Sequence, residues 1–305
     1  MKKLFIILAT VLGTLSLAAQ DKPRHAVVAL SSIYMRIAPD YESALETQEL
    51  MGTVVEITGE KNYWREIISP QPYKAWCTEK GLVEMSEEEL DAYLSAPKCM
   101  FTELYGHVYE TPSNKSQTIC DLVGGDVMRV AGNIKGQWTQ VMLPSGQTGW
   151  VYTKTIRPHN GFMSIAKGEG NEESISDGLM EQIIVTAYKL KGVPYLWGGM
   201  TPKGVDCSGL VRWSFIMNGI LLPRNASQII YCGDEVSLDS MQRGDLVFFG
   251  TPAKDGKPQR VTHIGIYIGE ERIIHSSHMV RVNSLCPTEP DYYENSHRLI
   301  AARRL

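Results

Sequence analysis

The sequence lacks a long apolar run outside its first 20 residues, and it lacks a strong charge of either sign. It has 30 Lys and Arg against 34 Asp and Glu, a formal net charge of -4. The first absence leaves no later segment that could span a bilayer. The second gives no reason to expect nucleic acid as a partner. The 305 residues are too many for one small core, so two or three domains are expected.

The one long apolar run stands at the start of the sequence. Lys2 and Lys3 precede LFIILATVLGTLSL, and the small residues Ala18 and Ala19 follow it. This pattern predicts a secretory signal peptide over residues 1–19, cleaved after Ala19. A retained membrane anchor is disfavoured because the run is shorter than the roughly 20 residues that a span needs. We therefore expect an exported protein, periplasmic or extracellular, with no stable membrane insertion after cleavage.

Paired metal-binding patterns are also missing. No C-x-x-C or H-x-x-x-H occurs, so we expect no metal and no other cofactor. The six cysteines are widely spaced, and if Cys207 is a free thiol an odd number remains for pairing. We therefore predict no disulfide framework. The cysteines are Cys77, Cys99, Cys120, Cys207, Cys232 and Cys286.

Two segments of about 60 residues repeat each other, about 73 residues apart. Trp64 in NYWREI corresponds to Trp138 in GQWTQV, and Trp76 in YKAWC corresponds to Trp150 in TGWVY. Each copy has short alternating runs punctuated by Gly, Pro and Asn, which predicts a small antiparallel all-β barrel. The order of the turn, Trp and Gly-Trp motifs resembles the bacterial SH3-like domain. We place these predicted domains at residues 24–84 and 98–158.

Two connecting segments separate the predicted domains. In residues 85–97, Ser86 and Glu89 form a possible capping box before an apolar stripe, which predicts a short helix ended by Pro97. Residues 159–174 include the polar, Gly-rich stretch KGEGNEES, which predicts a linker.

Residues 175–305 differ in character from the repeats. DGLMEQIIVTAYKLKG and SGLVRWSFIMNGI have apolar residues at helical spacing. The strand-like runs GDLVFFG, THIGIYIG and RIIHSS follow them. Helices followed by an antiparallel sheet predict an α+β domain.

Cys207 lies at the predicted N-terminus of the second of these helices, where Asp206 or Ser208 can cap. The N–H groups and dipole of a helix N-terminus favour a thiolate, so we expect a lowered thiol pKa. The same N–H groups could stabilise an oxyanion. A small buried core residue is the alternative, and position alone does not decide between them.

Two histidines favour the nucleophile. His263 and His275 are equidistant from Gly269, the expected turn of a β-hairpin, so we predict that they lie opposite each other on one face. His263 would then take the thiol proton and His275 would orient it. A metal site is disfavoured because His275 and His278 would point to opposite faces of their strand.

Five motifs, YLWGG, DCSGLV, RGDLVFF, HIGIYIG and IIHSS, occur in the order found in NlpC/p60 cysteine peptidases. Residues 175–305 resemble that family, and the resemblance implies a compact papain-like core. It implies Cys207 as nucleophile, His263 as base and His275 as the orienting residue. It also implies cleft residues at Tyr195, Trp197, Asp206 and Ser208.

With two SH3-like domains in front, the whole chain resembles the γ-D-glutamyl-L-diamino acid endopeptidases of this family. The resemblance implies an enzyme that cleaves peptidoglycan stem peptides with a free N-terminal L-Ala through a thioester. We expect this enzyme to be a monomer. It also implies a Glu and a Tyr from the first SH3-like domain, matched here by Glu46 and Tyr73, with Glu42 and Glu49 as rivals. Asp206 could also meet the ammonium. After LPR the group tends to have a hydroxyl, where this chain has Ala226 and then Ser227.

Two other functions stay open at this point. The chain could be an endolytic hydrolase of intact cell wall that uses its SH3-like domains as tethers. It could also be a wall-binding module without activity, although the Cys, His, His set argues against that. The choice between diaminopimelate and lysine in the substrate stays open as well.

Overall fold

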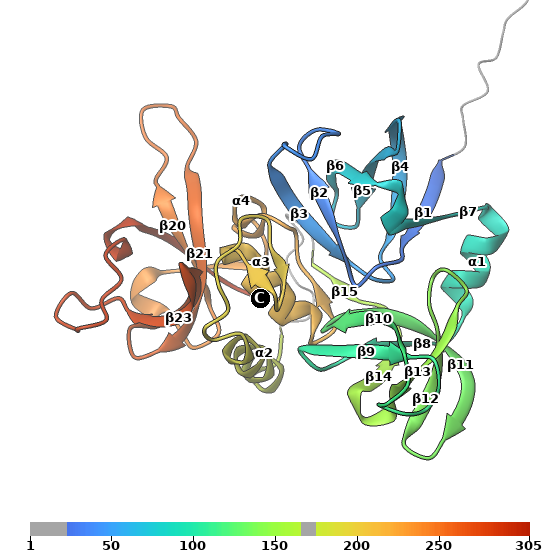
Figure 1. Cartoon of the computed structure of the whole chain (residues 1–305). Helices are drawn as coiled ribbons and strands as arrows, with labels where there is room; N and C mark the ends of the chain where they lie inside the picture. The colour runs from blue at the N-terminus through green and yellow to red at the C-terminus, as the bar shows by residue number, and fades with distance from the viewer. Residues whose placement is uncertain (1–22, 166–174) are drawn as a thin grey trace, which may run out of the picture.

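The computed structural model describes residues 23–165 and 175–305. The predicted signal peptide, residues 1–19, lies outside the described residues, as does most of the predicted linker. Figure 1 shows two N-terminal sheets on one side of the molecule and a mixed domain on the other. Most of the regular structure is β, with few helices, as predicted.

The first sheet has seven antiparallel strands in the order β3-β2-β6-β5-β4-β1-β7. Alternate residues such as Ala26, Val28, Val55 and Ile57 point inward and form its own small core. The strands are β1 Arg24–Val28, β2 Ser32–Arg36, β3 Leu45–Leu50, β4 Val54–Lys61, β5 Trp64–Ser69, β6 Tyr73–Thr78 and β7 Leu82–Met85.

The second sheet repeats this topology strand for strand, in the order β10-β9-β13-β12-β11-β8-β14. The internal repeat expected from the paired tryptophans is therefore confirmed as a repeat of structure. The strands are β8 Lys98–Phe101, β9 Tyr105–Tyr109, β10 Thr118–Val123, β11 Val127–Lys135, β12 Trp138–Met142, β13 Thr148–Tyr152 and β14 Ile156–His159.

A short helix, α1 Glu87–Ser95, joins the two sheets. Ser86 is its N-cap, and the reciprocal bonds between Ser86 and Glu89 form the predicted capping box. The predicted helix is thus confirmed, with its last residue two before Pro97.

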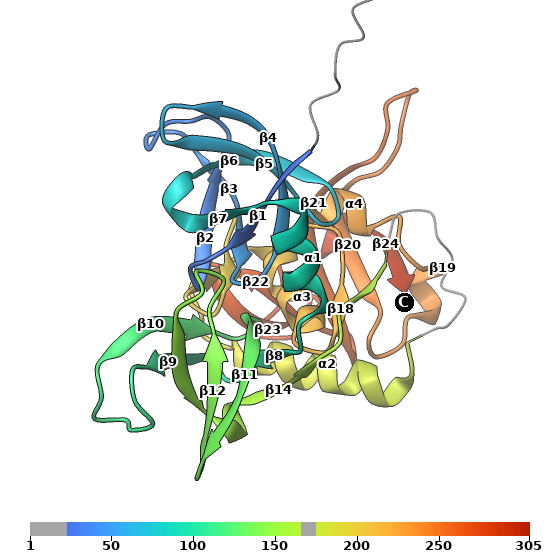
Figure 2. The same ribbon diagram turned by 90° about the vertical axis from the view of Figure 1, so that its right-hand side faces the viewer.

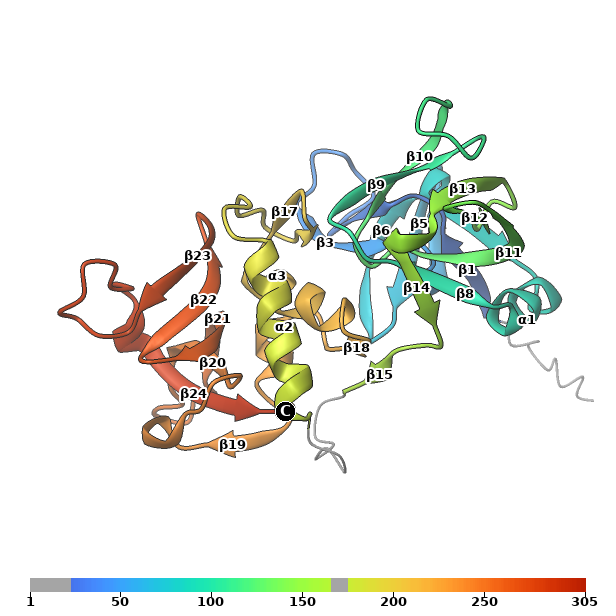
Figure 3. The ribbon, with the colours of Figure 1, turned by 90° about the horizontal axis from the view of Figure 1, so that it is seen from below.

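The third part of the chain is an α+β domain. Helices α2 Asp177–Lys189 and α3 Cys207–Ile216 lie side by side between the N-terminal sheets and the third sheet (Figure 3). The third sheet has the order β19-β24-β20-β21-β22-β23. Its strands are β19 Asp234–Val236, β20 Leu246–Thr251, β21 Arg260–Gly269, β22 Arg272–Ser277, β23 Met279–Ser284 and β24 Leu299–Arg304.

Smaller elements complete this domain. The helix α4 Ala226–Ile229 follows α3, and the pairs β15 Met163–Ser164 with β18 Ile220–Leu221 and β16 Met200–Thr201 with β17 Gly204–Val205 form two short ladders. The main core packs α2 and α3 against the strands β20–β22 through apolar residues that include Leu210, Phe248 and Ile274.

The predicted hairpin register is wrong by two residues. His275 pairs with Gly265 rather than with His263, because the ladder has an irregularity before Gly269 and the turn is Glu270–Glu271. Both turn residues have positive φ, 52° each, as a two-residue type I′ turn requires. A slip of two residues keeps every side chain on its face, so His263 and His275 still share one face.

The first sheet docks on the α+β domain through β3. Three consecutive polar residues of this strand, Thr47, Gln48 and Glu49, are buried. Gln48 Oε1 accepts a hydrogen bond of 2.8 Å from the backbone N–H of Met200, just before α3. Figure 2 shows the first sheet above the second, with the α+β domain beside both.

The second sheet also contacts this domain. The indole N–H of Trp213, in the middle of α3, donates a 2.7 Å hydrogen bond to the carbonyl of Gly124. The helix that begins with Cys207 is therefore held from both N-terminal sheets.

Candidate active site

Cys207 is the first residue of α3, and Asp206 is its N-cap. The Asp206 carboxylate accepts a 2.7 Å hydrogen bond from the backbone N–H of Gly209, which satisfies one of the free N–H groups of the first helical turn. Of the two predicted capping residues, Asp206 is the one that caps. The cap fixes the direction in which the helix begins and so fixes the Cys207 side chain.

The predicted lowering of the Cys207 pKa is wrong. Burial raises the pKa of this thiol to about 11, and the nearby Asp206 charge adds to the rise. Backbone hydrogen bonds from Ile264 and Ser208 and the charge of Arg224 act in the opposite direction but do not outweigh burial. At neutral pH the resting sulfur is therefore a thiol.

His263 and His275 form a direct pair. The Nε2 of His263 lies 2.8 Å from the Nδ1 of His275, and the two rings meet edge to face. Burial lowers the pKa of His263 to about 3 and that of His275 to about 4, so both rings are neutral at pH 7. The backbone N–H of Ile264, the residue after His263, bonds the Cys207 sulfur, so the strand that carries His263 passes beside the thiol.

Two tyrosines flank this group. Burial, the largest cause, and the charges of Cys207 and Asp206 raise the pKa of the Tyr195 phenol, so its hydroxyl keeps its proton. Tyr293, which sequence reasoning missed, packs on both imidazoles with ring centroids 4.6 Å from His275 and 5.6 Å from His263. Trp197 is 64% exposed and so offers an open apolar face.

Asp206 and Ser208 are part of a buried polar network around Arg224. Two guanidinium nitrogens of Arg224 bond the Asp206 carboxylate at 2.6 and 3.1 Å, and one also bonds Ser208 Oγ at 2.9 Å. The backbone N–H of Gly198 donates to the same carboxylate at 2.9 Å. Both oxygens of Asp206 are therefore occupied inside the protein. Sequence reasoning missed Arg224, whose one signal was a charge inside the apolar run ILLPR.

Glu46, on the edge strand β3 of the first sheet, contacts Tyr73, the first residue of β6. The Tyr73 hydroxyl donates a short hydrogen bond to the Glu46 carboxylate. Tyr73 is also hydrogen-bonded to the Asn225 side chain and interacts electrostatically with Arg224. Glu46 and Tyr73 therefore lie against the α+β domain, beside the Asp206 network.

The rivals of Glu46 are placed elsewhere. Glu49 is buried and faces Arg212 of α3 at 3.5 Å, and Glu42 is exposed in the loop before β3. Ser227 is exposed in the short helix α4, two residues after Asn225.

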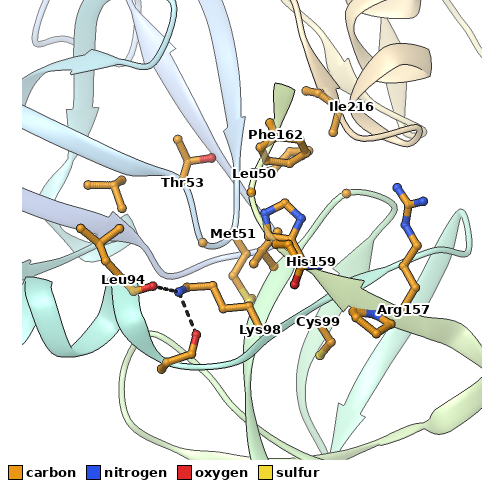
Figure 4. Close-up of a pocket in the computed structure, with 18 of the residues that line it drawn as sticks. Leu50, Met51, Thr53, Leu94, Lys98, Cys99, Arg157, His159, Phe162 and Ile216 are labelled. Atoms are coloured by element: carbon orange, nitrogen blue, oxygen red, sulfur yellow. Dashed lines mark hydrogen bonds between the residues drawn. The ribbon is translucent and has the colours of Figure 1, made fainter. Parts of the chain in front are cut away.

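A pocket of about 1060 Å³ lies away from this group, where the two N-terminal sheets meet the C-terminal end of α3 (Figure 4). Its lining includes Ile216 but not Cys207, His263 or His275. Two of its cations bond carbonyls at helix ends: Lys98 Nζ bonds those of Leu94 and Ala96 at the end of α1, and Arg157 bonds that of Met217 after α3. A third, Arg212, faces Glu49 at 3.5 Å. The pocket thus belongs to the domain junction.

Over 23–165 and 175–305, no cluster of three or more His, Cys, Asp or Glu could hold a metal ion. In the same ranges, every helix is too short or too polar to cross a bilayer. The six cysteines are all free thiols.

The fold and the Cys, His, His geometry agree with the comparisons to known proteins. Residues 192–299 match the NlpC/P60 family. The match covers the part of the chain that carries Cys207, His263 and His275, so this part is an NlpC/P60 peptidase domain, a hydrolase, and the predicted family is confirmed for it.

Two curated relatives match almost the whole chain. Dipeptidyl-peptidase 6 of Lysinibacillus sphaericus is 27% identical over 91% of this chain and 98% of its own length. Gamma-D-glutamyl-L-lysine dipeptidyl-peptidase of Bacillus subtilis is 27% identical over 86% of this chain and 82% of its own. A crystal structure of an NlpC/P60 family protein from Bacillus cereus superposes with a TM-score of 0.74 at 22% identity, over 92% of this chain and 99% of that chain. This likeness shows a shared fold.

Proposed function

We propose that the protein is a cysteine endopeptidase that cleaves the γ-D-glutamyl-L-diamino acid bond of peptidoglycan-derived peptides with a free N-terminal L-Ala. The full-length likeness to proteins named dipeptidyl-peptidase supports this activity. The two N-terminal sheets are, in this proposal, SH3-like domains, and the chain is exported to the periplasm or the cell surface.

The docking of β3 beside Cys207 is the observation that carries the proposal. Gly198 lies so close to β3 that a Cβ on it would be 3.0 Å from the Glu46 backbone. The loop that precedes Cys207 is therefore in van der Waals contact with the first sheet. If the N-terminal sheets only tethered the enzyme to the wall, they would not need to contact the active-site loop. If the first sheet closes one end of the substrate cleft, this contact is required.

Glu46 is the proposed partner of the substrate ammonium. Its carboxylate accepts a hydrogen bond from Tyr73 and keeps further acceptor sites free for an N–H donor. Asp206, the other candidate, already receives bonds from Arg224, Gly198 and Gly209. In this proposal Glu46, rather than Asp206, binds the substrate ammonium. Asp206 instead caps the helix that carries the nucleophile.

The chemistry follows from a neutral thiol and a neutral imidazole. As the Cys207 sulfur bonds the scissile carbonyl carbon, its proton passes to His263. The oxyanion is met by N–H groups at the start of α3, with Tyr195 as a further donor. His263 then protonates the departing amine, the C–N bond breaks, and a thioester remains. Water, deprotonated by His263, attacks the thioester and releases the acid and the thiol.

An endolytic hydrolase of intact wall is the second candidate. The observation in its favour is that the bifunctional muramidase/DL-endopeptidase of Bacillus subtilis is 45% identical over 98 residues, more than either full-length relative. That match covers 32% of this chain. It therefore does not bear on the role of the two N-terminal sheets, which is the point on which the two candidate functions differ.

The test is to incubate the protein with L-Ala-γ-D-Glu-diamino acid and with purified sacculi, and to identify products by mass spectrometry. We expect L-Ala-γ-D-Glu from the peptide and little release from sacculi. Cys207→Ala should abolish the product while its melting temperature stays within a few degrees, and Cys286→Ser, a thiol outside the site, should keep full activity. Equal release from sacculi would favour the endolytic enzyme, and binding to sacculi without any product would leave a wall-binding module.

A further inference from the structure

We propose that Asn283 is a positioning residue that sets the tautomers of both active-site histidines. The inference rests on the proposed function only for the role of His263 as base. Asn283 lies on β23, is buried, and bonds the ring nitrogen of His275 that does not face His263.

Three hydrogen bonds join a backbone carbonyl to the catalytic pair. The Nδ2 of Asn283 lies 2.6 Å from the carbonyl oxygen of Asp291. The Oδ1 of Asn283 lies 2.9 Å from the Nε2 of His275. The Nδ1 of His275 lies 2.8 Å from the Nε2 of His263. The chain of contacts therefore runs without a break from Asp291 to His263.

The carbonyl of Asp291 fixes which atom donates and which accepts in each hydrogen bond of this series. A carbonyl oxygen can only accept, so the amide group of Asn283 must face it with its N–H, which turns the Asn283 oxygen toward His275. That oxygen can in turn only accept, so the proton of His275 sits on Nε2. In the neutral ring the Nδ1 of His275 is then an acceptor, and the proton of His263 sits on Nε2.

The consequence is a free lone pair on the Nδ1 of His263, the one ring nitrogen left to take a proton from the Cys207 thiol. If the His275 proton moved to Nδ1, His263 Nε2 would have to accept and its Nδ1 would carry the proton. His263 could then no longer act as a base. The orientation of the Asn283 amide thus decides whether His263 can accept a proton from the Cys207 thiol.

The anchor itself is well held. The Asp291 carbonyl also accepts from the backbone N–H of Ser284 at 3.2 Å, and the Asp291 carboxylate pairs with Arg272. The charged and titratable groups around the two rings are Arg281, directly opposite His275 in the ladder, together with Tyr293 and Cys207. Burial is the main cause that keeps both rings neutral, and the cation of Arg281 further disfavours their protonation.

The experiment compares Asn283→Ala with Asn283→Asp. Alanine removes the acceptor, so kcat should fall by about 10- to 100-fold while KM stays within about 2-fold, as for other residues that orient a catalytic histidine. Aspartate keeps an acceptor for His275 Nε2–H but loses the N–H that Asn283 directs at the Asp291 carbonyl, so it should recover part of kcat. Its negative charge should also move the acid limb of kcat to higher pH. Asn133→Ala, an exposed asparagine of the second sheet, is the control and should leave both constants unchanged.

A second readout does not depend on turnover. Nitrogen-15 NMR of histidine-labelled protein at pH 7 should show His263 and His275 with Nε2 protonated and Nδ1 bare, and a mixed or reversed pattern in Asn283→Ala. Full kcat in Asn283→Ala, equal loss in the alanine and aspartate variants, or Nδ1 protonation in the wild type would overturn the proposal. If the wild-type protein does not cleave the peptide but shows these tautomers and loses them in Asn283→Ala, the proposed function fails and the positioning role stands.

Discussion

The Arg224 guanidinium and the Asp206 carboxylate form a two-point ion pair, at 2.6 and 3.1 Å, at the start of the helix that begins with Cys207. Arg224 is 1% exposed. Its Nε also donates to Thr47 of β3 at 2.6 Å. One buried cation therefore ties the nucleophile helix to the first sheet.

Breaking this pair should cost much more than breaking a surface pair. Arg224→Met leaves the Asp206 charge buried without its main partner, so the free energy of unfolding should fall by about 3–5 kcal/mol. Urea denaturation followed by circular dichroism measures it. Arg243→Ala, which breaks an exposed pair with Glu181, is the matched control and should cost about 0–1 kcal/mol. Similar losses in both variants would contradict the assigned role of Arg224.

The neutral histidine pair predicts an unusual pH dependence. Since burial lowers the pKa of His263 to about 3 and of His275 to about 4, the acid limb of kcat/KM should lie well below the ordinary histidine value of 6.5. An acid limb at 6.5 or above would show that burial does not lower the pKa of these imidazoles in the working enzyme.

The same pKa values determine whether the free energy of unfolding rises or falls with pH. Between pH 6.5 and about 4 the unfolded chain binds protons at these two histidines and the folded chain does not. The histidines' contribution to stability is therefore complete above pH 6.5 and is lost as the pH falls. Urea midpoints of the wild type should drop over this range, and the drop should be smaller in a His263→Gln, His275→Gln double variant. An equal drop in both proteins would rule out these two groups as its cause.

Gly198 offers a test of the contact between the active-site loop and the first sheet. It has φ +74°, and a side chain there would meet the Glu46 backbone, whereas Gly192 has φ +90° and open space around it. Alanine at either position carries the backbone strain of about 1–2 kcal/mol. Only Gly198→Ala should also raise KM for the free-amine peptide, because it pushes the loop off β3. Equal KM values in the two variants would argue against a docked sheet.

Much of the fold could be predicted because it depends on local patterns. Repeated Trp and Gly motifs predicted two copies of one sheet, and the capping box of Ser86 and Glu89 predicted α1. The hairpin register could not be predicted, since the turn falls at Glu270–Glu271 rather than at Gly269 and the ladder has an irregularity between Tyr267 and Gly269. The two-residue periodicity of a strand nevertheless kept His263 and His275 on one face.

The docking surface was the part that sequence patterns could not show. Thr47, Gln48 and Glu49 have the composition of a solvated strand, yet all three are buried because each meets a polar group of the α+β domain. The thiol pKa was mispredicted for a related reason. A helix N-terminus is visible in sequence, but the burial that outweighs it depends on the packing of distant strands.

The central claim is that Glu46 of the first sheet receives the free ammonium of the substrate. The most direct measurement is the ratio of kcat/KM for L-Ala-γ-D-Glu-diamino acid to that for its N-acetylated form. The wild type should favour the free amine by about 100-fold, the value of a charge-assisted hydrogen bond, and Glu46→Gln should reduce this ratio to below about 10. Glu42→Gln, on an exposed carboxylate of the loop before β3, should leave it unchanged. A wild-type ratio near one, or a ratio unaffected by Glu46→Gln, would contradict the account.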